Sequence, residues 1–302
     1  MQINKHGSFY IRNGWPTKII DALKTDSYIF SPNNELSAVD LIGVGRVMVK
    51  SMRYWATVLG IANEAKDQHG VRHILTPLGE MILERDLYCI DKGTLWLLHR
   101  NLSRDIDNAT AWNWAFNIYE EHSFTKSEFS TAFFAYLQRE GASYTQQTVD
   151  KEFDCFKNTY VSDQVFSISK IIDEDTAPFL APLKLLEYKG NGRFERRRTQ
   201  SNEIPLDIFL ACIIMDNDEH LTTNRQIDIE HLLEDSNQIC KYMNLSYSAL
   251  LEILMQLENK RYIRVVNNFG NRYIELNGIT VNELLLAHYQ LNGGKTECPI
   301  AN

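Results

Sequence analysis

The chain has 302 residues, of which 44% are hydrophobic and 23% are charged, and its net charge is −8. This length suits two or three globular domains, and the acidic balance excludes a protein that coats nucleic acid by overall attraction. Five scattered cysteines, no signal-peptide pattern and no long apolar run lead us to expect a cytoplasmic protein without disulfides, a zinc ribbon or a membrane segment.

Residues 1–90 are expected to form an N-terminal winged-helix DNA-binding domain. Gly43 separates two helices, Glu35–Ile42 and residues 44–58. A hairpin over residues 61–75 and a further helix follow. The order helix, helix, hairpin, helix is typical of a winged helix.

The helix over residues 44–58 separates positive charge from large apolar side chains. At about 100° per residue, Lys50 and Arg53 lie within about 40° of Arg46. The apolar residues lie on the opposite side: Met48, Met52, Trp55 and Leu59. A recognition helix needs this division, because one face packs on its domain while cations on the other reach phosphates or guanine edges. The alternative is a solvated cationic helix face.

The Gly-Val-Gly of residues 43–45 also invites comparison with a nucleotide-binding loop. That loop requires G-x-G-x-x-G between a strand and a helix, whereas Met48 stands at the third glycine position and a helix comes first. We therefore expect these glycines to form a turn between helices.

Residues 91–200 are expected to form a helical bridge and a middle winged-helix-like module. The bridge holds Trp96, Trp112 and Trp114, which we expect in the core. The module ends in a hairpin over residues 183–198, with a Gly-Asn-Gly turn and five cations from Lys189 onward. We expect these cations to bind backbone phosphate, and the alternative is a basic linker or a partner-binding surface.

Residues 201–302 repeat the pattern as a C-terminal winged-helix-like domain. Its helix after Ser246 presents Glu252 and Glu258, whose carboxylates would repel a duplex. We therefore expect protein contact or homodimer formation here, although Arg264 and Arg272 on its hairpin leave a DNA contact open.

The sequence thus predicts a mainly α fold with short β-hairpins (α+β), in which several winged-helix-like modules are joined by a helical bridge. The residues predicted to contact double-stranded DNA are cations of the first and middle modules: Arg46, Lys50, Arg53, Arg72, Lys189, Arg193, Arg196, Arg197 and Arg198.

Evidence for catalysis is weaker than evidence for DNA contact. Asp173 and Asp175 precede Glu187 and Lys189, in the loose order of metal-dependent nucleases, whose carboxylates hold Mg²⁺ or Mn²⁺ beside a lysine. This pattern is degenerate and also falls on a predicted hairpin. These four residues are the catalytic candidates, and the metal ligands stay unassigned.

Five stretches resemble successive signatures of a bacterial family of unknown function, whose SspB-like members nick DNA in the Ssp single-strand phosphorothioation and phage-defence system. They are "FYIRNGW" (residues 9–15), "GVGRVMVKSMRYW" (43–55), "LTPLGEMILERD" (75–86), "GTLWLLHRNL" (93–102) and "AWNWAFN" (111–117). Weaker similarity extends through "TVDKEFDCFKNTY" and "APLKLLEYKGNGRF".

The resemblance implies a DNA-nicking role, with a cysteine desulfurase, an ATPase and a PAPS-reductase-like sulfurtransferase as companions. We know of no catalytic motif of the family that can be placed on particular residues of this chain. The sequence therefore supports three hypotheses: a protein that nicks or presents DNA for phosphorothioate modification, a non-enzymatic DNA-binding regulator, and an assembly scaffold of the defence cluster.

Overall fold

The computed structural model describes residues 1–161, 177–221, 225–268 and 270–291. These residues are mainly helical and form three small antiparallel sheets, which confirms the predicted α+β class. None of the helices in these ranges has the length and apolar character needed to cross a membrane.

The first section contains four helices and one hairpin. In chain order its elements are α1 (Trp15–Thr25), α2 (Glu35–Ile42), α3 (Arg46–Val58), β1 (Ala62–Asp67), β2 (Gly70–Leu75) and α4 (Pro77–Arg85). The sequence pattern predicted this order from α2 onward and missed α1. That helix begins after Gly14, which has a positive φ and no capping side chain, so the usual start signal is missing.

Two glycines bring the elements of this section close together. Gly43 ends α2 with φ 71°, a left-handed conformation that costs glycine little and lets α3 begin three residues later. A Cβ atom on Gly79 would lie 2.1 Å from the carbonyl oxygen of Ile61, so only glycine allows α4 to pack this closely against the start of the hairpin.

The middle section is built on two central helices and a three-stranded sheet. Its elements are α5 (Lys92–Arg104), α6 (Thr110–Asn117), β3 (Ser123–Thr125), α7 (Lys126–Arg139), α8 (Gln146–Tyr160), β4 (Leu186–Gly190) and β5 (Arg193–Arg196). The sheet order is β3-β5-β4, with Phe124 opposite Phe194. The sequence pattern missed β3, because three residues are too few to show strand alternation.

The last section has the same order of a helical part followed by a hairpin. Its elements are α9 (Leu206–Asp216), α10 (Asp218–Leu221), β6 (Gln226–Asp228), α11 (Ile229–Glu234), α12 (Ile239–Tyr242), α13 (Tyr247–Asn259), β7 (Ile263–Asn268), β8 (Asn271–Leu276) and α14 (Val281–Leu291). Its sheet order is β6-β8-β7, and the short elements α10 and β6 were not predicted.

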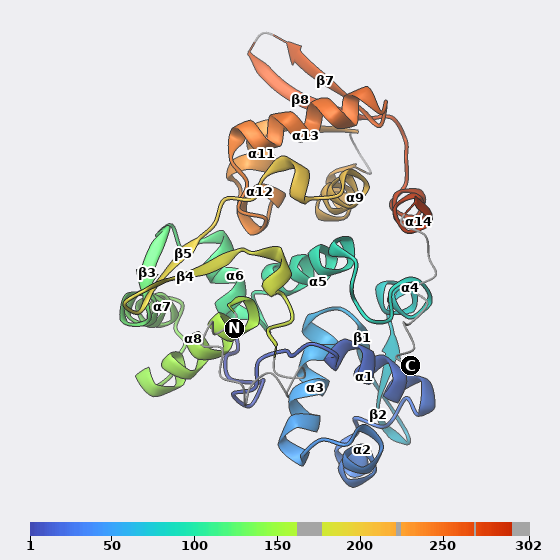
Figure 1. The fold of residues 1–302 in the computed structure, drawn as a ribbon, viewed down its shortest axis with the longest axis vertical. Helices are drawn as coiled ribbons and strands as arrows, with labels where there is room; N and C mark the ends of the chain where they lie inside the picture. The colour runs from blue at the N-terminus through green and yellow to red at the C-terminus, as the bar shows by residue number, and fades with distance from the viewer. Residues whose placement is uncertain (162–176, 222–224, 269, 292–302) are drawn as a thin grey trace, which may run out of the picture.

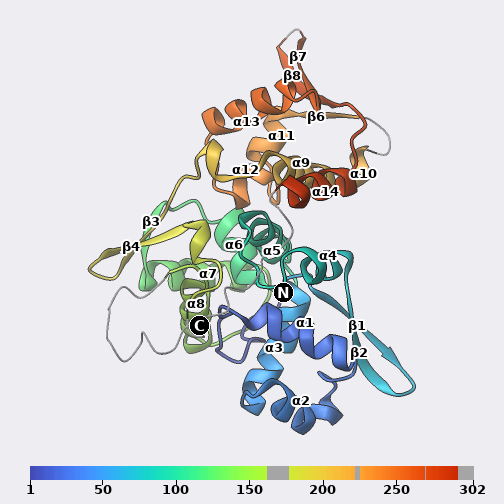
Figure 2. The ribbon, with the colours of Figure 1, turned by 45° about the vertical axis from the view of Figure 1, so that its right-hand side comes forward.

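Helices α5 and α6 lie in the middle of the molecule, with the first and last sections at opposite ends (Figures 1 and 2). Trp96, Trp112 and Trp114 are buried there, which confirms that the bridge aromatics are packing residues. Trp112 meets Trp55 of α3 edge to face, with 5.4 Å between ring centroids. The core of the first section therefore continues into the bridge.

Polar groups join the last section to the bridge. The side chain of Asp216, at the end of α9, is inaccessible to solvent and lies 2.6 Å from Nε of Arg100 and 3.2 Å from Nε of Arg104. The hydroxyl of Tyr242 donates a hydrogen bond of 2.7 Å to this carboxylate. Burial raises the pKa of Asp216, and the two arginines oppose that rise.

His99 of α5 bonds to helices of two sections. Its Nε2 lies 2.8 Å from the carbonyl oxygen of Tyr242, and its Nδ1 lies 2.9 Å from the hydroxyl of Tyr160. Because a carbonyl only accepts, Nε2 carries the proton and Nδ1 accepts from Tyr160. Burial lowers the pKa of His99 to about 4.

This lowered pKa predicts a loss of stability in mild acid. Between pH about 6.5 and pH about 4 the unfolded chain binds a proton at His99 that the folded chain does not bind, so the free energy of unfolding should fall by about 3 kcal/mol across that window. Urea unfolding at several pH values measures this fall. H99Q should be less stable at pH 7 and should lose less than wild type on acidification. Exposed His69 provides the control H69Q, and an unaltered pH profile in H99Q would contradict the assignment.

Candidate nucleic-acid interface

Helix α3 is anchored by the apolar face that its sequence predicts. Met52, Trp55 and Leu59 are inaccessible to solvent, and Met48 is partly buried. The indole Nε1 of Trp55 donates a hydrogen bond of 3.0 Å to the carbonyl oxygen of Phe9. The orientation of α3 is therefore set by its own section and by the bridge.

The cations of α3 lie on the opposite face and are paired with carboxylates. Glu35, on α2, accepts a hydrogen bond from Nε of Arg46 and lies 3.2 Å from Nζ of Lys50. The two cationic side chains are 65% and 59% exposed, whereas Glu35 is 12% exposed. The hydrogen bond from Arg46 lowers the pKa of Glu35, so this carboxylate is ionised at neutral pH.

Arg53 is paired across to the hairpin. Its Nη2 lies 2.7 Å from Oε2 of Glu64 on β1. Behind this pair, His73 is buried, and its Nε2 lies 3.5 Å from the same Oε2 of Glu64. Burial lowers the pKa of His73, so it is neutral at pH 7. His73 therefore supports the hairpin from its buried side.

Arg72 and His69 occupy the outer part of the β1–β2 hairpin. Arg72 lies 3.5 Å from Asp67, whose carboxylate also accepts a 2.7 Å hydrogen bond from the hydroxyl of Tyr28. These contacts fix the hairpin to the loop that follows α1. The cations of α3 and the β1–β2 hairpin thus belong to one section of the protein.

The β4–β5 hairpin presents a second basic group at its tip. Lys189 and Arg193 flank the turn, and their nearest acidic partners are Glu187 at 2.7 Å and Glu128 at 3.5 Å. Asn191, in the turn, has φ 51°, as the Gly-Asn-Gly signal predicts. This hairpin and the β1–β2 hairpin lie on opposite sides of the molecule in both views (Figures 1 and 2), so they do not form one surface.

The three arginines after the hairpin tip make structural contacts. Arg196 donates to the carbonyl oxygen of Ala115 at 2.9 Å, and burial lowers its pKa to about 10. Arg197 makes two hydrogen bonds of 2.8 Å to Glu203. Arg198 is exposed and lies 3.3 Å from the side-chain oxygen of Asn244. These contacts hold the return strand against the bridge and the last section.

The structure describes two of the four catalytic candidates, Glu187 and Lys189. Asp173 and Asp175 lie outside the described residues, and Glu187 is paired with Lys189 at 2.7 Å. Within the described ranges, no group of three His, Cys, Asp or Glu side chains is arranged to hold a metal ion. The structure therefore assigns no metal ligand to these candidates.

The sequence pattern did not reveal the carboxylates that face the cations. Glu35 and Glu64 each lie eleven positions from an arginine of α3, on a different element, so no helical or strand spacing relates them. Their role follows from the folding of α2 and β1 against α3. With three cations and two carboxylates, this face carries a net charge of about +1.

Two solved structures resemble this fold over nearly its whole length. "Magnesium ion-bound SspB crystal structure" is 19% identical to the chain, with a TM-score of 0.81, and covers 98% of this chain and 90% of that one. "SspB crystal structure" is also 19% identical, with a TM-score of 0.78 and the same coverage. None of the curated proteins matches the sequence.

The family assignment rests on sequence as well as on shape. Residues 3–289 match the family described as "Protein of unknown function (DUF4007)". Together with the two SspB structures, this match confirms the resemblance inferred from the sequence signatures. The chain belongs to the DUF4007 family.

Proposed function

We propose that the protein binds double-stranded DNA through residues 1–90, with α3 as the recognition helix and β1–β2 as the wing of a winged-helix domain. The observation that carries this proposal is the two-sided α3. Trp55 fixes one face in the core, while Arg46 and Lys50 are exposed on the other. The element order of α2, α3 and the hairpin supports the same interpretation.

The ion pairs with Glu35 and Glu64 affect how the α3 cations would bind DNA. A carboxylate holds a guanidinium much as a phosphate does, so phosphate groups would compete with Glu35 for Arg46 and Lys50. Exposed ion pairs are weak, and exchanging the acceptor therefore costs little. The carboxylates keep the cations oriented in the free protein and limit binding to non-specific polyanions.

The β4–β5 tip is the second DNA contact in this proposal, through Lys189 and Arg193. Arg196, Arg197 and Arg198 are assigned to holding the hairpin in place. The last section, residues 201–302, is assigned to protein contact, including contact with a second copy of the chain. Glu252 of α13 is exposed there and accepts a hydrogen bond from Ser201.

The biological role that we infer is to nick or present DNA for phosphorothioate modification in a bacterial defence system. Family membership and the similarity to SspB support this role, and the companions would be a cysteine desulfurase, an ATPase and a PAPS-reductase-like sulfurtransferase. One SspB structure is described as magnesium-bound, but no described group of residues in this chain fits a metal. We therefore derive no catalytic step through a metal.

The nicking part of the proposal predicts relaxation of supercoiled plasmid by the purified protein. Open circles should appear with Mg²⁺ or Mn²⁺ and should be absent with a chelator, as measured by gel electrophoresis over time. Plasmid that stays supercoiled under every metal, while still binding the protein, would leave DNA presentation or regulation as the function and reject nicking.

Removing the α3 cations should weaken DNA binding and its dependence on salt. In R46A/K50A/R53A, the slope of log K against log[salt] should fall by about one for each phosphate that α3 no longer neutralises, as measured by fluorescence anisotropy with a labelled duplex. K24A/K92A/K151A removes the same charge from exposed sites elsewhere and should keep the wild-type slope. Equal slopes in both triple variants would reject α3 as the recognition helix.

Neutralising Glu35 or Glu64 should strengthen DNA binding. E35Q and E64Q release cations from their acidic partners, so each should raise duplex affinity by about threefold to tenfold at low salt. D40N changes an exposed acid elsewhere on α2 and serves as the control. If E35Q bound duplex more weakly than D40N, Glu35 would be orienting the cations rather than competing for them.

A further inference from the structure

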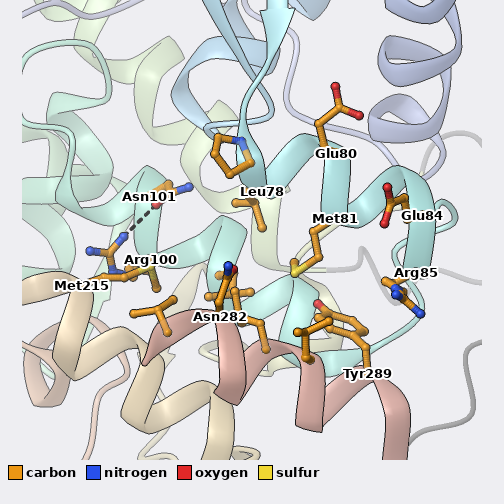
Figure 3. A pocket seen from close by; sticks show the side chains of 15 residues that line it. Leu78, Glu80, Met81, Glu84, Arg85, Arg100, Asn101, Met215, Asn282 and Tyr289 are labelled. Carbon is orange, nitrogen blue, oxygen red and sulfur yellow. Dashed lines mark hydrogen bonds between the residues drawn. The ribbon is translucent and has the colours of Figure 1, made fainter. Parts of the chain in front are cut away.

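An apolar cavity lies between the first and last sections of the protein. It has a volume of about 370 Å³ and lies between α4 and α14, with α5 and the end of α9 as its other walls. Leu78 and Met81 extend from α4 toward α14, and Met215 contributes from α9 (Figure 3). This volume and this lining are typical of a site for a small organic molecule.

The cavity exists because α14 is anchored to other elements. His288 Nε2 donates to Asp91 at 2.7 Å, and the hydroxyl groups of Tyr289 and Thr94 lie 2.7 Å apart. A Cβ atom on Gly93 would come within 2.5 Å of His288, so the helices meet closely at this point. α14 also packs along α9 but approaches α4 less closely, and the space between α4 and α14 is left to side chains.

One end of the cavity carries a cation, and the lining also includes three exposed charged residues of α4, Glu80, Glu84 and Arg85. The guanidinium of Arg100 lies at that end beside Asn101, and its Nη1 donates to the side-chain oxygen of Asn101 at 3.0 Å (Figure 3). Its Nε donates a hydrogen bond of 2.6 Å to Asp216. In the described part of the chain, no group accepts a hydrogen bond from its other terminal nitrogen, Nη2.

Arg100 and Arg104 together carry more positive charge than their shared carboxylate balances. Asp216 is a single carboxylate shared by Arg100 and Arg104, so the three side chains carry a net charge of about +1. The arginine side chains are 13% and 25% exposed. A partly buried excess cation favours an anionic ligand group, because water screens it less than it screens a surface charge.

We propose that this cavity binds an amphipathic monocarboxylate, whose apolar chain lies between α4 and α14 and whose carboxylate meets Arg100. The ligand would contact α4, which directly follows the β1–β2 hairpin, and α14, which belongs to the last section. Binding would therefore join α4 of the first section to α14 of the last section. The site is separate from the DNA-binding face, and its test does not depend on DNA.

The test uses the full chain labelled with ¹³C at its methionine methyl groups and titrated with decanoate below its micelle concentration. The resonances of Met81 and Met215 should shift and saturate, while those of Met52 and Met243, which are buried elsewhere, should stay in place. Decanol should bind at least about tenfold more weakly, because it lacks the charge that meets Arg100. Decylammonium, with the opposite charge, should not bind.

Two variants locate the site. M81W fills the cavity and should abolish the response at Met215, whereas Q290W places the same side chain at an exposed position of α14 and should bind as wild type does. Unchanged Met52 and Met243 resonances show that each variant is folded. Absence of saturable shifts up to about 1 mM decanoate, or shifts spread over all methyl groups, would overturn the proposal. Equal affinity for decanol and decanoate would overturn the role of Arg100.

Discussion

The sharing of one buried carboxylate, Asp216, by two arginines of the central helix holds the last section to the rest of the molecule. A carboxylate that leaves water needs partners that replace its hydration, and Arg100, Arg104 and Tyr242 provide them. The partners come from α5 and α12, so the bond network forms only when the last section docks on the bridge. His99 adds a neutral link from α5 to α8 and α12 in the same core.

This central arrangement places the β1–β2 and β4–β5 hairpins on opposite sides of the molecule. The cations of α3 depend on the bridge through the contact of Trp55 with Trp112, whereas the β4–β5 tip depends on Arg196 and Arg197. An acidic protein can present two local positive groups because exposed charges act over only about 8–10 Å at ordinary ionic strength. The carboxylates next to those groups then decide how strongly each one attracts a polyanion.

Much of the secondary structure could be predicted, because helix periodicity, glycine turns and capping residues are local signals. The buried face of α8, formed by Val149, Phe153, Phe156 and Tyr160, follows directly from its spacing. Elements without local signals were missed: α1 lacks a capping side chain, and β3 and β6 have three residues each.

The sequence by itself determined that α3 has one apolar and one cationic face, because that division depends only on helix geometry and on the order of Arg46, Lys50, Met52 and Trp55. It also identified the family through its signature stretches. Only the tertiary structure decided which carboxylates face those cations and which arginines of the β4–β5 hairpin make structural contacts. It also decided that a cavity remains between α4 and α14. Each of these depends on contacts between residues that are far apart in the chain. The local periodicity of a sequence does not predict such contacts.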